Sequence, residues 1–147
     1  MNWTYALIVF GVGMLLPMQA GINAKLAQAL QHPGRAALMQ FTVGLIAILL
    51  ALVAFRLLPF SPTLFNQTRW WHWLGGLCGA VLVLSSMILA PTLGATLFFA
   101  LIIAGQLTAS SIIDHFGWLG YAQHPMHWGR ALGIFCLVLG VGLLQKF

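Results

Sequence analysis

Acidic side chains are almost missing from this chain, in which Asp114 is the only aspartate or glutamate among 147 residues. Acid–base catalysis by paired carboxylates therefore has no second partner. The sequence also lacks HExxH, GxSxG and a phosphate-binding glycine loop. We therefore expect no enzymatic activity and no bound cofactor.

Charge of either sign is scarce. Charged residues make up 5% of the chain and apolar residues 61%, and its mean hydropathy is +0.99. No charged residue lies between Arg69 and Asp114, which are 45 positions apart (114 − 69). Because roughly a quarter of the residues in a soluble domain are charged, this composition predicts an integral membrane protein whose solvent is the lipid bilayer.

The basic residues and the cysteines form no cluster. The six Lys and Arg residues are scattered, and the pI near 10.1 reflects the missing acids. This distribution argues against a nucleic-acid partner. Cys78 and Cys136 lie in apolar runs without a CxxC spacing, which favours small buried apolar side chains over a disulfide or a metal site.

Histidines gather near the single acid, since His115, His124 and His127 follow Asp114 within one stretch. A metal or hydrolytic site is one interpretation of this group. The HPMH spacing at 124–127 matches no established ligand motif. We therefore favour neutral histidines at the membrane surface and expect no metal.

Hydropathy predicts five membrane-spanning helices of about 20 residues each. The apolar stretch 70–113 is too long for one span, because it would extend about 66 Å as a helix. Pro91 and Gly94 near its middle predict a short turn between two antiparallel helices, and a proline-rich connection at 59–63 precedes the stretch. We expect one all-α transmembrane domain over 1–147, with helices at about 3–30, 36–58, 70–90, 93–113 and 128–145.

The first span is expected to remain in the membrane. Residues 5–16, followed by Pro17, resemble the apolar core of a signal peptide. However, the first four residues contain no Lys or Arg, and no clean small-residue cleavage site follows. We therefore predict a membrane helix rather than a cleaved leader.

The charges on the two sides of the membrane are balanced. Five spans place the N-terminus and the second and fourth connections on one side, with Arg56, Arg69 and Arg130. The other side has Lys25, Arg35 and Lys146. Since an excess of Lys and Arg normally marks the cytoplasmic side, a difference of 3 − 3 = 0 favours insertion in both orientations and pairing with an inverted copy. The alternative is a fixed orientation set by a weaker signal.

Polar side chains within the spans are the candidate binding residues. Gln19 and Asn23 share one face of the first helix at i, i+4, and Gln40 lies near the start of the second. In the fourth helix Gln106, Ser110 and Asp114 recur every four residues. Such groups face protein or water rather than lipid. We select six residues as substrate-binding candidates: Gln19, Asn23, Gln40, Gln106, Ser110 and Asp114.

Two of these candidates have a second interpretation. Gln106 either lines a translocation pathway or forms an interhelical hydrogen bond. Asp114, at the helix end, either contributes to the same face or forms a surface salt bridge to a loop arginine. Small-residue spacings such as Ala100/Ala104 and Gly105/Ala109 on the fourth helix predict close helix packing.

Three sequence stretches resemble the short five-helix YdcZ-like family of the drug/metabolite transporter superfamily: 17–26 (PMQAGINAKL), 69–76 (RWWHWLGG) and 91–117, which begins PTLGA and ends IDHFG. The resemblance implies a half-transporter bundle in the bacterial inner membrane. In larger superfamily members two such halves are fused with inverted topology around a central cavity. It implies transport, without assigning a cargo.

Together these features predict a small inner-membrane transporter that exports a small metabolite by alternating access. The first- and fourth-helix polar faces of an antiparallel homodimer, or of a pair with a paralogue, are expected to line the substrate path. The rival hypothesis is a non-transporting membrane subunit whose polar faces contact a partner complex and enclose no water.

Overall fold

The computed structural model describes residues 3–58, 66 and 68–146, and this part of the chain forms helices without strands. Each long helix is long and apolar enough to cross a membrane, with η1 extending the third span. This confirms the predicted all-α architecture of five spans. The elements are α1 (Trp3–Ala29), α2 (Pro33–Ala54), η1 (Trp70–Trp73), α4 (Leu74–Leu93), α5 (Ala95–Phe116), η2 (Trp118–Gly120) and α6 (Trp128–Lys146).

Helices α1 and α2 end at residues that are not glycine. Gln31 (φ 55°) and Arg56 (φ 56°) adopt the left-handed conformation that usually follows a helix C-terminus. The His32 amide donates to the Ala27 carbonyl at 3.1 Å, and the Leu57 amide donates to the Leu52 carbonyl at 2.9 Å. This hydrogen-bond pattern ends α2 at Ala54, four residues before the predicted boundary at 58.

The start of α2 also differs from the predicted position. His32 is the N-cap, and its Nδ1 accepts a hydrogen bond from the Gly34 amide at 3.0 Å. Pro33 occupies the first helical position, where its missing amide proton is not needed. The helix therefore begins three residues before 36. The proline-rich connection predicted at 59–63 lies outside the described residues.

The break between α4 and α5 falls at Gly94 rather than at Pro91. Pro91 is contained in the last turn of α4. Gly94 has φ 81° and ψ 145°, a conformation essentially restricted to glycine. The sequence predicts a turn between Pro91 and Gly94, and the backbone conformation of Gly94 alone is sufficient to make it.

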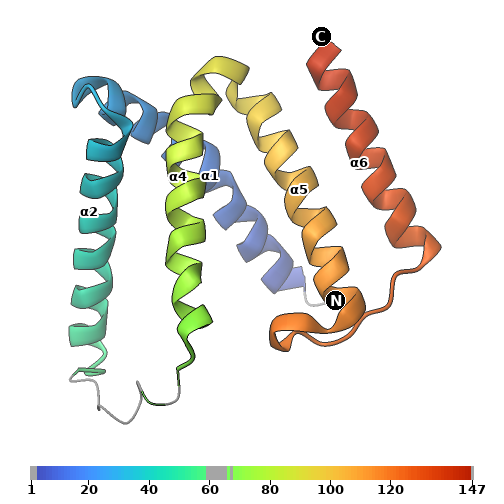
Figure 1. Ribbon diagram of the computed structural model, residues 1–147, viewed down its shortest axis with the longest axis horizontal. Coiled ribbons are helices and arrows are strands. Elements are labelled where there is room, and N and C mark those ends of the chain that lie inside the picture. The colour runs from blue at the N-terminus through green and yellow to red at the C-terminus, as the bar shows by residue number, and fades with distance from the viewer. Residues whose placement is uncertain (1–2, 59–65, 67, 147) are drawn as a thin grey trace. The chain divides into compact units, whose positions relative to one another are not determined.

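The chain forms two compact units, residues 1–92 and 93–147, each described by itself. In the first unit, the turn at 30–32 joins α1 to α2 (Figure 1), and Met87 of α4 packs with Ala36 and Ala37 of α2. In the second unit, α5 packs against α6, and Phe98 and Val141 are buried. The single-domain assignment over 1–147 stays a prediction.

Gly94→Ala is expected to destabilise the protein by about 1–3 kcal/mol, the cost of holding a non-glycine residue in this conformation. A Cβ at position 94 meets no atom within 4 Å, so the expected cost comes from the backbone rather than from a clash. Reversible unfolding in mixed micelles measures the change. Gly44→Ala in α2, where a Cβ also meets nothing, serves as the control and should not destabilise.

Candidate functional site

The first cluster of polar side chains joins α1 to α2. The Asn23 Nδ2 donates a hydrogen bond of 2.5 Å to the Gln40 Oε1. Asn23 is only 5% exposed, and Gln40 is half-buried. Asn23 lies nine residues before His32 and Gln40 eight residues after it, so the hairpin brings the two amides to the same depth.

Gln19 lies one helical turn before Asn23 on α1. Its side chain is exposed, and within the described part of the chain it has no hydrogen bond. Pro17 lies in the same helix, where it removes one backbone donor from the middle of the span. The α1 face therefore has one amide paired within the chain and one amide available to another molecule.

Several hydroxyl groups within the spans donate to carbonyls of their own helices. In α5 the Thr108 Oγ1 donates to the Ala104 carbonyl at 2.8 Å, and the Ser110 Oγ donates to the Leu107 carbonyl at 3.2 Å. Thr42 makes the same bond in α2, at 2.8 Å to the Leu38 carbonyl. Such back-bonding needs no partner outside the helix. Ser110 can consequently face lipid, protein or substrate at little cost.

Gln106 is different because its amide is too long and too polar to be satisfied in this way. It is the twelfth of 22 residues in α5, so it lies at the middle of the span. Its side chain is exposed and makes no hydrogen bond in the described regions. Hydrocarbon offers an amide no partner, and each unsatisfied polar group there costs several kcal/mol. Gln106 therefore requires water, a substrate or another protein surface.

Asp114 takes part in a network at the end of α5. Its carboxylate lies 3.5 Å from the Arg130 Nη1, and both side chains are partly exposed. The Asp114 carbonyl accepts the His124 amide at 2.8 Å, and Arg130 also donates to the His124 carbonyl at 3.1 Å. The predicted salt-bridge alternative is thus formed, with an arginine in the first turn of α6 rather than in a loop.

The histidine stretch has a structural role in this network. The His115 Nδ1 accepts a hydrogen bond from the Met126 amide at 3.0 Å, and the Gln123 side chain donates to the His115 carbonyl at 3.0 Å. Among the described residues, no three His, Cys, Asp or Glu side chains are close enough together to hold a metal ion. These contacts attach the connection at 117–127 to the ends of α5 and α6.

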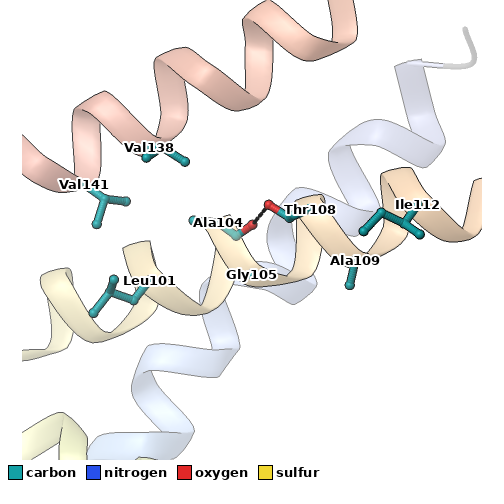
Figure 2. A pocket seen from close by; sticks show the side chains of 8 residues that line it. All are labelled: Leu101, Ala104, Gly105, Thr108, Ala109, Ile112, Val138 and Val141. Atoms are coloured by element: carbon teal, nitrogen blue, oxygen red, sulfur yellow. Dashed lines mark hydrogen bonds between the residues drawn. The ribbon is translucent and has the colours of Figure 1, made fainter. Parts of the chain in front are cut away.

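The second unit also contains a groove between α5 and α6, with a volume of about 510 Å³. Figure 2 shows Val138 and Val141 of α6 on one wall and the small residues of α5 on the other. We name it the α5–α6 groove, and its lining consists of Leu101, Ala104, Gly105, Thr108, Ala109, Ile112, Val138 and Val141. Its one polar side chain, Thr108, is already bonded to Ala104.

The candidates thus fall into separate groups within each unit. Asn23 and Gln40 are hydrogen-bonded in the first unit, whereas Gln106 and Ser110 share a face of α5 in the second. Asp114 is engaged by Arg130, a partner that the sequence analysis did not name. The expectation that Cys78 and Cys136 are buried is wrong: both are free and exposed, because apolar surface of this chain is solvated by lipid instead of being packed inside.

The sequence of the chain matches one known protein family over nearly its whole length. Residues 4–143 match the family described as "Putative inner membrane exporter, YdcZ". The chain belongs to the YdcZ family. Comparison with curated proteins and with solved structures finds no match.

The YdcZ match extends from the first span into the fifth and includes every candidate residue from Gln19 to Asp114. The protein is therefore a multi-pass protein of the bacterial inner membrane. The family is described as one of exporters, which is not a class of enzymes. This supports a small-molecule substrate and contact between the five spans and lipid.

The Asn23–Gln40 pair should show energetic coupling in this YdcZ protein. In a double-mutant cycle with Asn23→Ala and Gln40→Ala, we expect a coupling free energy of about 0.6–1.7 kcal/mol, the range of interhelical hydrogen bonds in membranes. Unfolding in mixed micelles provides the measurement. Thr42→Ala, which removes only a bond within α2, should be additive with Asn23→Ala. A coupling near zero would contradict the pair.

Proposed function

We propose that the protein is one half of an exporter that works as an antiparallel homodimer and moves a small uncharged or amphipathic molecule outward by alternating access. The observation that carries the proposal is the amide of Gln106. It lies at the middle of an apolar span, exposed and without a hydrogen bond in the described part of the chain. A substrate path past α5 supplies the partner that this amide needs.

The balance of charges supports the inverted second copy. All six basic residues lie at or near the ends of the helices, and five alternating spans would place three of them on each side of the membrane. A chain without an orientation signal inserts both ways. Two inverted copies then reproduce the inverted repeats on which alternating access depends in many secondary transporters.

The polar side chains within the spans limit which chemical class of cargo can bind. The only acid, Asp114, lies near the end of α5 and pairs with Arg130, so no carboxylate is available at mid-membrane to bind an organic cation. The remaining candidates are amides and one hydroxyl. These groups hydrogen-bond to neutral polar groups such as amides, hydroxyls and carbonyls, and exposed apolar side chains along the spans suit an amphipathic cargo.

We assign distinct roles to the candidates. Gln106 and Gln19, whose amides are unpaired in the described regions, bind the substrate directly. Asn23 and Gln40 form a pair that can open and exchange partners with the substrate. Ser110 extends the polar face of α5. Asp114 is assigned to the rim of the path, where its exchange between Arg130 and the substrate or water accompanies opening.

Changing the charge balance should fix the orientation. Arg56→Gln with Arg69→Gln leaves one basic residue against three, so the C-terminus is expected in the cytoplasm. Lys25→Gln with Arg35→Gln is the mirror variant and should place it outside. C-terminal reporters active on one side only measure the ratio, with signal from both sides for the unmodified chain and at least a ten-fold bias for each variant.

A control variant and a co-expression test accompany this experiment. Gln31→Asn, a neutral change in the turn that precedes Arg35, should leave the ratio unchanged. Each mirror variant alone should fail to export, and their co-expression should restore export because it restores an inverted pair. A one-sided signal from the unmodified chain would refute dual insertion.

Replacing the central amide should impair transport. Gln106→Leu is expected to lower export about ten-fold, since a mid-membrane hydrogen bond is worth about 1–2 kcal/mol and 1.4 kcal/mol corresponds to a factor of ten. Proteoliposomes loaded with an extract of small bacterial metabolites, with released compounds identified by mass spectrometry, provide the assay. Leu107→Met, at the next position, which is also exposed, should leave export unchanged.

Thiol labelling separates an exporter from a non-transporting subunit. In a chain without Cys78 and Cys136, single cysteines at Phe99, Ile103, Gln106 and Ser110 report on water. A membrane-impermeant reagent should reach these positions in an exporter, and substrate should protect them. Labelling absent from all four positions, together with no release of any metabolite, would favour the subunit.

A further inference from the structure

Helix α5 presents two different faces. At about 100° per residue, Leu101, Gly105, Thr108 and Ile112 lie on one side of the helix, and Gln106 and Ser110 lie about 130° and 170° away from the centre of that side. The first side forms a wall of the α5–α6 groove. The groove is therefore separate from the polar face to which the substrate is assigned.

The groove offers nothing for a polar cargo to bind. Figure 2 shows Thr108 with its hydroxyl directed to the Ala104 carbonyl, 2.8 Å away. The other lining side chains are apolar, and Gly105 has no side chain. A Cβ added at Gly105 meets no atom within 4 Å, so the backbone of α5 is open to close approach. Small residues of this kind let two membrane helices pack closely.

The depth of the groove is its second property. Gly105 is the eleventh of 22 residues in α5, and Val138 is the eleventh of 19 in α6. The groove therefore lies at mid-membrane. In an antiparallel dimer the two-fold axis runs in the membrane plane at that depth, so a surface can meet its own copy only near the middle of a span.

From these properties we propose that the α5–α6 groove is the self-contact of the dimer, where α5 of a second, inverted copy crosses α5 at Gly105. The balanced charges at the span ends favour a second copy as the occupant, because they permit the inverted orientation that a self-contact at mid-depth needs. This inference rests on the proposed antiparallel pair and adds the surface that forms it. A lipid acyl chain and a substrate are the competing occupants.

Antiparallel crossing at Gly105 imposes a rule on which residues meet. Positions whose numbers sum to 210 come together, so 105 faces 105 of the partner and 101 faces 109. A parallel crossing brings 101 to 101 and 109 to 109 instead. Disulfides form only when the Cα atoms are about 4.4–6.8 Å apart, which makes oxidative cross-linking a direct test of the rule.

The experiment uses the full chain in membranes, with Cys78 and Cys136 replaced by alanine. Chains with two different tags are co-expressed, one with Leu101→Cys and the other with Ala109→Cys, and oxidised with copper phenanthroline. We expect at least ten-fold more cross-linked dimer for 101 with 109, and for Gly105→Cys with itself, than for 101 with 101. Leu107→Cys, at similar depth on another side of α5, is the control and should not cross-link.

The cross-linking pattern distinguishes a failure of this interface from a failure of the proposed antiparallel pair. Cross-links of 101 with 101 and 109 with 109 would overturn both the inference and the antiparallel pair. If no α5 position cross-links while reporters show both orientations and export persists, this interface alone is wrong.

Filling the groove gives a second readout. Gly105→Leu should lower the dimer fraction about ten-fold in a dilution series of fluorescent chains in vesicles, while Gly105→Ala has a smaller effect. A Cβ at position 105 meets no atom within 4 Å, so alanine fits the single chain without a clash, and circular dichroism checks that the leucine variant keeps its helices. An unchanged dimer fraction would assign the groove to lipid or substrate and refute the self-contact.

Discussion

Hydrocarbon provides no hydrogen-bond partner, and this constraint determines how each polar group of the chain is placed. The backbone meets it by forming helices, in which each span satisfies its own amides and carbonyls. Thr42, Thr108 and Ser110 meet it by bonding to carbonyls one turn earlier. Asn23 and Gln40 meet it by bonding to each other. Gln19 and Gln106 remain without a hydrogen bond among the described residues, and the proposed substrate path rests on these two amides.

The same constraint explains why much of the fold could be predicted from the sequence. An apolar run of about 20 residues has one stable form in a bilayer, so five runs predicted five helices, which the structure confirms. The bounds of α2 were predicted less well, because His32 caps its start and Arg56, which is not a glycine, adopts the left-handed conformation just after its end. Gly94, by contrast, is the expected residue in its turn, and the break is found within the predicted segment.

Side-chain partners were only partly predictable. Asn23 and Gln40 lie nine and eight residues from His32, and these nearly equal separations predict that the two residues meet, since a hairpin places such residues at one depth. Arg130 could be recognised as the partner of Asp114 only once the loop at 117–127 was folded back by His115 and Gln123. The exposure of Cys78 and Cys136 was mispredicted because burial in soluble proteins is a poor guide where lipid solvates apolar surface.

The two faces of α5 have a mechanical consequence if the helices cross at Gly105. Alternating access in an inverted pair requires the two copies to exchange conformations, so that the side open inward becomes the side open outward. A contact on the two-fold axis is common to both states and can act as a pivot. Gln106 is one residue from this contact. It would stay near mid-membrane throughout the exchange and hold the cargo at a constant depth, while the ends of the spans, where Asp114 and Arg130 lie, move the most.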